Sequence, residues 1–338
     1  MSSRIAINGF GRIGRNAFKI ALENYGPDAE IVAINDLFPP SQLAHLLKYD
    51  STYGIFDHEV SADDNSIIVD GEHYPIYGEK DPTNLPWRDL GVDVVIESTG
   101  HFVNPEKARA HIEAGAKKVV LSAPAKGEGA TTIVLGVNDD DIETAGDIIS
   151  NASCTTNCIA PVMSVLENNF GVEKAMMSTV HSYTSDQRLL DSPHRDERRM
   201  RSAAKNIIPT STGASIAATK VIPTLKDKFG GLSMRVPTPV VSISDITALM
   251  KRDVTAEEVN DVFRKAAKED YYEGILDATD EKLVSSDFIG DPHSSIVDLS
   301  LTQVVQGNLL KVVAWYDNEW GYSNRLVELT IDVAKSLE

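Results

Sequence analysis

The chain contains only two cysteines, Cys154 and Cys158, among 338 residues. This is far below the cysteine content of a disulfide-stapled secreted scaffold, so a reducing compartment fits better. The first residues lack the basic start, the apolar run and the cleavage site of a signal peptide. The longest uncharged stretch, residues 148–166, is interrupted by serine, threonine and asparagine, so it fails as a membrane span of about 20 apolar residues. We therefore expect a soluble cytoplasmic protein.

Basic residues are also scarce. The chain has 32 Lys and Arg against 50 Asp and Glu, which gives a formal net charge of −18. A field of this sign repels nucleic acid and anionic membranes, so we expect neither as a primary partner. Any anionic ligand then needs a local basic site. The acidic surplus fits either an ordinary acidic surface or an adaptation to salt.

Apolar residues make up 42% of the chain and charged residues 24%, as in ordinary globular proteins. At roughly 100–200 residues per domain, the length predicts two domains. Over the first 150 residues, short β-branched runs alternate with helical patterns, which is typical of β-α-β units around a parallel sheet. We expect helices over residues 17–25 and 105–114, and strands over 4–8, 31–34, 93–96, 118–121, 133–135 and 148–149.

The pattern changes beyond residue 170 to longer, partly alternating strands at 240–250 and 309–316, with amphipathic helices at 256–267 and 323–336. This change predicts an α+β second domain with a mainly antiparallel sheet, and a boundary near residue 153. The segment between Tyr183 and Pro209 shows no clear periodicity and carries several arginines. Long irregular segments are often functional, but a solvated or interface-forming basic face is an equal reading. The arginines are Arg195, Arg198, Arg199 and Arg201.

Three glycines form the pattern G-x-G-x-x-G directly after the first expected strand: Gly9, Gly11 and Gly14. Such glycines permit a tight turn and let the backbone approach a pyrophosphate at a helix N-terminus. Asp36 ends the second strand, 22 residues after Gly14, where a carboxylate can accept hydrogen bonds from an adenosine ribose. An acid here repels a 2′-phosphate. The pattern thus predicts a Rossmann-type domain that binds NAD, although glycine turns can also serve packing alone.

Cys154 lies at the start of a helical pattern, because apolar residues follow it at helical spacing over 159–166. A helix N-terminus stabilises the thiolate, which makes Cys154 a candidate nucleophile. The alternative is a small buried side chain without a chemical role. Cys158 lies one turn further along and is expected to be inert, or a disulfide partner on oxidation. Two thiols alone cannot complete a zinc site, so we expect no metal.

His181 follows the apolar run 175–180 and is the candidate acid–base partner of Cys154. If the two side chains are close, they form a thiolate–imidazolium pair. A purely structural histidine is the alternative, because the sequence does not give the distance between them.

Six segments together resemble phosphorylating glyceraldehyde-3-phosphate dehydrogenase, in that family's order and spacing and along essentially the whole chain. They are residues 8–15 (NGFGRIGR), 153–158 (SCTTNC), 181–187 (HSYTSDQ), 210–214 (TSTGA), 235–239 (RVPTP) and 315–323 (WYDNEWGYS). The resemblance implies that the C-terminal helix returns to the cofactor domain. The NAD-binding domain is then residues 1–153 and 318–338, and the catalytic domain is residues 154–317. The resemblance also implies a homotetramer, with the segment 183–209 at the subunit core near a neighbouring cofactor.

The resemblance further implies a mechanism. The Cys154 thiolate attacks the aldehyde of glyceraldehyde 3-phosphate to form a thiohemiacetal. His181 removes the hydroxyl proton as hydride leaves for the nicotinamide of NAD, and a thioester results. Inorganic phosphate then attacks the thioester and releases 1,3-bisphosphoglycerate. His181 and the Cys154 amide are placed to stabilise the oxyanions of these steps.

By correspondence with the family, Thr184, Asp186 and Arg235 line the pocket that binds the phosphate of the substrate. Asp186 more reasonably orients a donor than contacts an anion. The pocket that binds the attacking phosphate is lined by Ser153, Thr155, Thr212 and Gly213. Beyond the three glycines and Asp36, the cofactor-binding residues implied are Phe10, Arg12, Ile13, Ser122 and Asn318, the last as the partner of the nicotinamide carboxamide.

Some positions depart from the commonest family pattern, namely Ser185, Ile216 and Val240, but none of them removes a group with a chemical role. Ser192 matters more. In members that use NAD strictly, a leucine usually precedes the proline at this point, whereas Ser192 is polar and Pro193 retains the NAD-type residue. Together with Asp36, this pair predicts a preference for NAD with some use of NADP possible.

Two other functions compete with this interpretation. Erythrose-4-phosphate dehydrogenase shares the cysteine and histidine, but its members lack the Tyr-Thr-x-Asp pattern found here at 183–186 and the Thr-Gly pair at 212–213. The other is a regulator that binds NAD or RNA without catalysis. The presence of Cys154, His181 and Arg235 argues against lost catalysis, and the net charge argues against a general nucleic-acid role.

Overall fold

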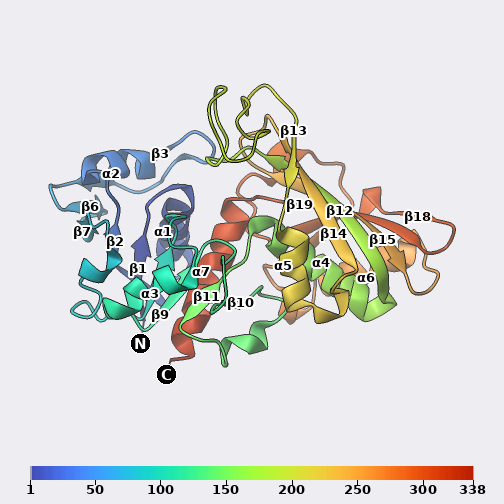
Figure 1. Ribbon diagram of the computed structural model, residues 1–338, viewed down its shortest axis with the longest axis horizontal. Helices are drawn as coiled ribbons and strands as arrows, with labels where there is room; N and C mark the ends of the chain where they lie inside the picture. Colours follow the sequence, from blue (N-terminus) through green and yellow to red (C-terminus); the bar gives the residue numbers. More distant parts are fainter. Residues whose placement is uncertain (1, 338) are drawn as a thin grey trace. The chain divides into compact units, whose positions relative to one another are not determined.

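The computed structural model describes residues 2–337, which divide into two compact units (Figure 1). Unit 1 comprises Met1–Ile133, Asp139–Ala152 and Ser323–Glu338, and unit 2 comprises Val134–Asn138 and Ser153–Tyr322. The domain boundaries expected from the sequence, 1–153 with 318–338 against 154–317, stay a prediction.

Unit 1 is built on a nine-stranded sheet. The strands are parallel from one edge to the seventh strand, and the last two pair antiparallel. In spatial order they are β10 (Thr131–Thr132), β11 (Ile148–Ser150), β9 (Lys118–Leu121), β8 (Val94–Glu97), β1 (Ser3–Asn8), β2 (Ala29–Asn35), β7 (Glu72–Tyr77), β6 (Ser66–Val69) and β5 (Val60–Ala62). The chain order reverses direction at β1, which has β2 on one side and β8 on the other. In parallel sheets, ligands bind at the carboxyl ends of the strands at such a point.

The centre of this sheet is buried on both faces, since Ile5, Ala6 and Ile7 of β1 are fully enclosed. Such continuous apolar strands are typical of parallel sheets covered by helices. Helix α7 (Trp320–Lys335) belongs to unit 1 from Ser323 onward, and its Glu328 accepts a 2.7 Å hydrogen bond from the Tyr25 hydroxyl. The remaining elements of the unit are α1 (Arg12–Asn24), α2 (Pro40–Lys48), α3 (Pro105–Glu113) and the short hairpin β3 (Tyr49–Asp50) and β4 (Gly54–Ile55).

Unit 2 contains an eight-stranded, mostly antiparallel sheet in the order β13-β14-β12-β15-β19-β17-β16, with β18 paired to β19. The parallel pairs are β12 with β14 and β16 with β17. The strands are β12 (Val172–Ser182), β13 (Ile208–Ser211), β14 (Phe229–Val236), β15 (Ser242–Met250), β16 (Leu276–Thr279), β17 (Ser295–Asp298), β18 (Gln303–Val305) and β19 (Leu309–Tyr316). Helices α4 (Cys154–Phe170), α5 (Ala214–Val221) and α6 (Ala256–Ala266) pack on the sheet. The fold class predicted from the sequence is therefore confirmed.

Four expected elements differ from the structure. The helix expected over 17–25 is α1, which begins at Arg12 and ends at Asn24. The strand expected at 133–135 is displaced to β10, because Val134 and Leu135 enter a turn in which Asn138 Oδ1 accepts the Val134 amide at 2.8 Å. The strand expected from residue 240 begins at Ser242, because Val241 has a left-handed φ of 66° that interrupts an extended strand. The last helix begins at Trp320 rather than at 323.

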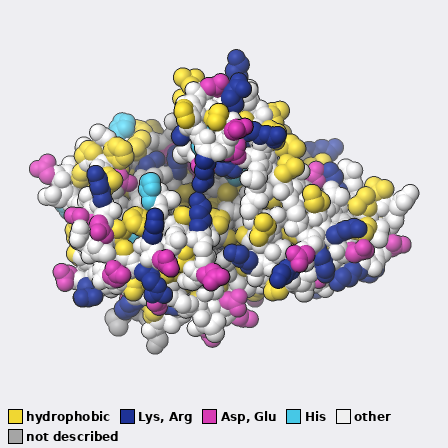
Figure 2. Space-filling view, in the orientation of Figure 1, with side chains coloured by type: hydrophobic (Ala, Val, Ile, Leu, Met, Phe, Trp, Pro, Cys, Tyr) yellow, Lys and Arg dark blue, Asp and Glu magenta, His cyan; other side chains and the backbone are white. Residues whose placement is uncertain are grey.

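Residues 183–207 contain no helix or strand, as the lack of periodicity predicted. The segment is held by internal hydrogen bonds, such as Ala203 N to Arg188 O at 2.9 Å and Ser192 N to Met200 O at 3.0 Å. Figure 2 shows hydrophobic and basic side chains together on this loop at the top of the view, where Leu189 and Leu190 are strongly exposed. No helix within residues 2–337 is long and apolar enough to cross a membrane.

Candidate active site

Cys154 is the first residue of helix α4, as the sequence predicted. Ser153 caps the helix, because its Oγ accepts the Thr156 amide at 3.1 Å. The free amides of the first turn and the helix dipole favour negative charge at this end, which is where a thiolate or an oxyanion would form. Cys158, one turn further along, is fully buried, and burial raises its pKa to about 12. Cys154 is therefore the cysteine available for chemistry.

His181 lies close to Cys154, with 3.4 Å between Nε2 and the thiol Sγ. The histidine is near the carboxyl end of β12 and is paired across the sheet with Arg235 of the parallel strand β14. This register places Arg235 Nη1 2.9 Å from His181 Nδ1, on the opposite side of the ring from the thiol. Two residues that are 54 positions apart in the chain thus meet because their strands are neighbours.

The contacts of His181 Nδ1 favour one neutral tautomer, because the shorter is to a carbonyl oxygen at 2.7 Å and the longer to Arg235 Nη1 at 2.9 Å. Nδ1 lies 2.7 Å from the carbonyl oxygen of Ser182, which can only accept a hydrogen bond. The ring therefore carries its proton on Nδ1 and directs the lone pair of Nε2 at Cys154. Arg235 Nη1 donates to the same carbonyl at 3.0 Å. Nε2 is thus the basic atom that faces the thiol.

The pKa shifts favour a neutral pair. Burial, followed by the charge of Arg235, lowers the pKa of His181 to about 3. Burial raises the pKa of the Cys154 thiol, and the charge of Arg235 and hydrogen bonds from Thr155 oppose that shift. A thiol beside an imidazole is therefore favoured over the expected thiolate–imidazolium pair, and Nε2 is in place to take the thiol proton.

The buried side chain of Tyr316 packs beside His181 and Thr155. Tyr316 OH lies 2.9 Å from Thr155 Oγ1 and 2.8 Å from Thr179 Oγ1, and its ring packs edge-on against that of His181 at 6.0 Å. Burial raises the pKa of Tyr316, so the phenol remains protonated. Thr155 therefore contacts Tyr316 through its hydroxyl, and both its hydroxyl and its backbone amide act on the Cys154 thiol.

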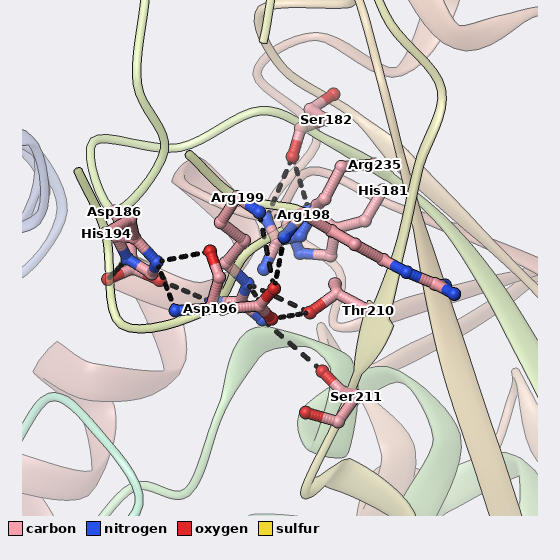
Figure 3. Close-up of polar contacts among 10 residues, drawn as sticks. All are labelled: His181, Ser182, Asp186, His194, Asp196, Arg198, Arg199, Thr210, Ser211 and Arg235. Atoms are coloured by element: carbon pink, nitrogen blue, oxygen red, sulfur yellow. Dashed lines mark hydrogen bonds and ion pairs between the residues drawn. The ribbon is translucent and has the colours of Figure 1, made fainter. Parts of the chain in front are cut away.

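Asp186 and Arg199 form the second polar cluster of the site (Figure 3). Arg199 Nη1 donates to Asp186 Oδ2, while Nε donates to Thr210 Oγ1 at 3.0 Å and Nη2 donates to the Ser211 carbonyl at 3.3 Å. Burial opposes ionisation of Asp186, but the hydrogen bond and charge of Arg199 outweigh it and hold the pKa of its carboxyl below the usual value. Asp186 thus orients a cation, as its chemistry suggested. The cluster also ties the loop to β13.

Thr212 and Gly213 lie at the start of α5, which packs beside α4. Gly213 is the N-cap residue, and Thr212 Oγ1 accepts the Ala214 amide at 3.2 Å. Thr184 begins the turn that carries Asp186, since its carbonyl accepts the Gln187 amide at 2.9 Å. Among residues 2–337, no hydrogen bond links Thr184, Thr212 or Gly213 to Cys154 or His181. Their phosphate-binding roles stay a prediction.

The glycine loop lies in unit 1 between β1 and α1, where the sequence placed it. Gly9 has a φ of 94°, and a Cβ there would lie 2.7 Å from the Thr99 nitrogen. A Cβ on Gly14 would lie only 2.1 Å from the Gly9 carbonyl oxygen. A Cβ on Gly11, the N-cap of α1, would meet nothing within 4 Å. Two glycines therefore permit close packing, and the third leaves open the space where a pyrophosphate would approach.

Asp36 follows β2 and is fixed by two backbone amides, with Phe10 N at 2.8 Å from Oδ2 and Phe38 N at 3.1 Å from Oδ1. It borders a cavity of about 370 Å³ within unit 1. The residues that line the cavity include Gly9, Gly11, Asp36, Phe38, Ser98 and Thr99. A carboxylate, an open helix N-terminus and apolar side chains fit an adenosine with its ribose and pyrophosphate, so the observed residues fit NAD.

Other predicted cofactor residues contribute in more limited ways. The Phe10 ring is buried against Phe18, so only its backbone can face a ligand. Arg12 pairs with Asp50 through its side chain, and Ser122 directly follows β9, where its amide donates to the Glu97 carbonyl at 2.9 Å. Ile13 is half-buried in the first turn of α1.

Asn318 lies in unit 2, two residues after β19, and is almost fully buried. Its Oδ1 accepts a hydrogen bond from Ser242 Oγ at 2.9 Å. Its contact with the nicotinamide carboxamide stays a prediction.

Sequence reasoning missed several residues of these sites. Arg199 was noted only as part of a basic segment, and nothing in its spacing separated it from its arginine neighbours. Ser98 and Thr99 line the cavity beside the glycine loop, and the sequence did hold a signal for them. They directly follow a strand of the parallel sheet, and the carboxyl ends of parallel strands lie at the same edge. The other missed residues are Thr179, Ser242 and Tyr316.

Comparison with known proteins gives two family matches. The family model described as glyceraldehyde 3-phosphate dehydrogenase, NAD binding domain, matches residues 3–105, and that of the C-terminal domain matches residues 153–318. The chain is 54% identical over 338 residues to glyceraldehyde-3-phosphate dehydrogenase of Streptomyces coelicolor, covering 100% of both chains. It is 53% identical over 336 residues to glyceraldehyde-3-phosphate dehydrogenase 1 of Bacillus subtilis and 54% over 335 to the enzyme of Geobacillus stearothermophilus, each covering 99% of both chains.

Proposed function

The chain belongs to the glyceraldehyde-3-phosphate dehydrogenase family of NAD-dependent oxidoreductases, and we propose that it oxidises glyceraldehyde 3-phosphate with NAD and inorganic phosphate to 1,3-bisphosphoglycerate. The observation that carries this proposal is the 3.4 Å separation between Cys154 Sγ and His181 Nε2 at the N-terminus of α4. A nucleophile, a base and fixed dipoles meet there, as covalent aldehyde chemistry requires. The reaction is the reversible oxidative step of glycolysis.

The covalent step uses the neutral pair. As Sγ attacks the aldehyde carbon, His181 Nε2 takes the thiol proton and passes it to the carbonyl oxygen, which becomes the hydroxyl of a thiohemiacetal and leaves Nε2 neutral for the next step. The Cys154 amide and the first amides of α4 are placed to stabilise the developing oxyanion. The Nδ1–H bond to the Ser182 carbonyl keeps Nε2 directed at the reacting atoms throughout.

Oxidation converts the thiohemiacetal to a thioester. NAD, when bound, supplies the acceptor for the hydride that leaves the substrate carbon. His181 Nε2 takes the hydroxyl proton, which makes the carbon a better hydride donor. In the last step a phosphate oxygen bonds to the thioester carbon, the carbon–sulfur bond breaks, and Cys154 is released with its sulfur electron pair.

The phosphate groups are bound by Arg235 and Arg199. Arg235 Nε is buried and has no hydrogen-bond partner among residues 2–337, so a phosphate oxygen would satisfy it. Arg199 is held in place by Asp186 and Thr210 and adds a second charge. The hydroxyls and amides of Ser153, Thr155, Thr184, Thr212 and Gly213 complete the two phosphate sites. Two arginines supply the local positive charge that this acidic chain needs.

The glycine loop and Asp36 hold the pyrophosphate and ribose of NAD, and Asn318 holds the nicotinamide carboxamide. The amides of Phe10, Arg12 and Ile13 and the strand-end residue Ser122 support the cofactor. Because both oxygens of Asp36 are fixed by backbone amides, the carboxylate cannot turn away from a 2′-phosphate. NAD is therefore the preferred cofactor. Ser192, a polar residue where strictly NAD-using members have leucine, still permits some turnover with NADP.

We also propose a homotetramer that works in the cytoplasm. One face of the unit 2 sheet carries exposed apolar side chains, including Met176, Leu232 and Leu309, which are 63%, 38% and 41% exposed. In the loop, Leu189 and Leu190 are 74% and 75% exposed. Apolar sheet faces of this kind are typical of subunit interfaces. Light scattering after gel filtration measures the mass of the assembly and tests the proposed homotetramer. A monomer at micromolar concentration would contradict it.

The decisive experiment measures initial rates of NAD reduction with glyceraldehyde 3-phosphate, with and without inorganic phosphate. Phosphate-dependent turnover is expected, and the Cys154→Ser variant is expected to lose it. The Cys158→Ser variant is the matched control, since that thiol is buried one turn away and should leave turnover intact.

The outcomes separate the competing functions. Turnover that is equally fast without phosphate would show that the enzyme is not phosphorylating. Turnover with erythrose 4-phosphate and none with glyceraldehyde 3-phosphate would identify the related dehydrogenase. NAD binding without turnover of either aldehyde would indicate a regulator. Rates with NADP determine the effect of Ser192.

A further inference from the structure

We propose that Ser242 is a positioning residue that sets the orientation of the Asn318 amide and anchors the backbone beside His181. The inference rests on the proposed function, because Asn318 matters for nicotinamide binding only if the protein uses NAD. Ser242 contacts neither reacting atom. Its hydroxyl instead connects the residue expected to bind the nicotinamide with the strand that carries the base.

Ser242 is the first residue of β15 and is only 1% exposed. Its Oγ–H donates to Asn318 Oδ1 at 2.9 Å, and the same oxygen accepts the Ser182 amide at 3.1 Å. Both capacities of the hydroxyl are therefore used. Ser242 is paired with Tyr316 on β19, which brings Asn318, two residues further along the chain, within its reach.

The first consequence concerns the polarity of Asn318. With Oδ1 occupied by the Ser242 hydroxyl, the amide presents its NH₂ group to a ligand, and Nδ2 has no hydrogen bond within residues 2–337. A donor in this position recognises the carbonyl oxygen of a carboxamide and rejects its NH₂ group. Ser242 thereby selects one of the two rotamers of the nicotinamide carboxamide. An Asn318 free to flip would lose that selection.

The second consequence concerns the backbone beside His181. Val241 has a φ of 66°, which is strained for a β-branched residue, and the ladder between β12 and β15 ends at Val180 and Ile243. Beyond the last pair of this ladder, the Ser182 amide donates to Ser242 Oγ at 3.1 Å. Ser182 Oγ in turn donates to the Val241 carbonyl at 2.6 Å. These bonds hold the residue whose carbonyl fixes the tautomer of His181.

The test compares the binding of NAD with that of ADP-ribose, which lacks only the nicotinamide. For Ser242→Ala we expect the Kd for NAD to rise about 3- to 10-fold, the range of one hydrogen bond. The Kd for ADP-ribose should stay within about 2-fold. Ser244→Ala is the matched control, because Ser244 lies two residues along the same strand, is equally buried and forms no hydrogen bond with Asn318 or Ser182 among the described residues. Isothermal calorimetry measures all three proteins.

A second readout follows the stereochemistry of hydride transfer from substrate deuterated at the aldehyde carbon. Wild-type protein should place deuterium on one face of the ring, and Ser242→Ala should place a measurable fraction on the other face. Ser242→Cys, which retains a weak donor, should lie between the two in Kd, and it decides the question if the alanine variant does not fold.

Equal weakening of NAD and ADP-ribose, or no change in either, would overturn the positioning role of Ser242. Wild-type protein that binds NAD but oxidises no aldehyde refutes the proposed activity, while the ratio of the two Kd values still decides on Ser242. Wild-type protein that does not bind NAD refutes both.

Discussion

Nη1 of Arg235 lies 2.9 Å from Nδ1 of His181, and the two residues are paired on the neighbouring parallel strands β14 and β12. A guanidinium is always charged, so its presence disfavours a second positive charge on the imidazole and favours a negative charge on the Cys154 sulfur. One side chain thus lowers the pKa of both reacting groups. Burial decides the net shift of each, since it opposes ionisation of either group.

The first prediction follows from this charge. Arg235→Leu should raise the pKa of the Cys154 thiol by about one unit, the usual effect of removing a close opposite charge. The measurement is the rate of alkylation by iodoacetamide as a function of pH, without cofactor or substrate. Arg198→Leu is the control, since the Arg198 guanidinium donates to the Pro209 carbonyl at 3.3 Å and has no hydrogen bond to His181 or Cys154 among the described residues. An unchanged midpoint in the Arg235 variant would contradict the assigned coupling.

The second prediction concerns acid stability. His181 has a pKa of about 3 in the folded protein, against about 6.5 in an unfolded chain. Between these values the unfolded state binds a proton that the folded state does not, so stability is lost as pH falls below about 6.5. His181→Gln removes this effect. Its free energy of unfolding relative to wild type should therefore increase as pH falls, by at most about 1.4 kcal/mol per pH unit.

Urea unfolding at pH 7.5, 6.0 and 5.0 and at one fixed protein concentration measures this difference. The same substitution should reduce turnover at pH 7.5 by about 10²- to 10⁴-fold, the usual contribution of a general base. A difference in stability that is independent of pH would mean that His181 titrates normally in the folded protein.

The third prediction distinguishes two adjacent arginines. Arg199→Leu should raise the KM for inorganic phosphate at least about 10-fold, because a charged hydrogen bond contributes about 1.5–3 kcal/mol. Arg198→Leu should leave it unchanged, since Figure 3 shows that side chain extending away from Asp186 and His181. Initial-rate kinetics at saturating NAD measure both. Equal effects of the two variants would indicate a general loss of positive charge in place of a specific contact.

The sequence predicted the parts of these sites that local patterns encode. The glycine spacing placed Gly9, Gly11 and Gly14 between a strand and a helix, and the polar run before an apolar helix placed Cys154 at its N-terminus. Both predictions depend on residues close together in the chain. The parallel sheet of unit 1 followed from the same kind of local alternation.

What local patterns could not predict was the register between distant strands. His181 and Arg235 meet because β12 pairs with β14, although the segment between them contains a further strand and a helix. Arg199 could not be separated from its neighbours, because only the fold brings Asp186 and Thr210 to it. The late start of β15, at Ser242 in place of residue 240, depends on the left-handed φ of Val241, which the sequence does not indicate because β-branched residues favour extended backbone.

The last prediction separates the packing role of one glycine from the binding role of another. In Gly14→Ala the new methyl group would lie 2.1 Å from the Gly9 carbonyl oxygen, so the backbone must shift. Overpacking of this kind destabilises by about 3 kcal/mol or more when backbone is the neighbour. In Gly11→Ala the methyl meets nothing within 4 Å and φ is −74°, so stability should change by less than about 1 kcal/mol.

For the affinity for NAD, we expect Gly11→Ala to have a large effect although it leaves stability nearly unchanged. Gly11→Ala places its methyl in the space where the pyrophosphate reaches the amides of α1, so the Kd for NAD should rise at least about 10-fold in a protein that is otherwise stable. Thermal unfolding and calorimetric titration with NAD measure the two quantities for both variants. A stable Gly11→Ala protein with unaltered NAD affinity would show that the pyrophosphate does not approach this residue, and the cofactor site would then have to be sought at another end of the sheet.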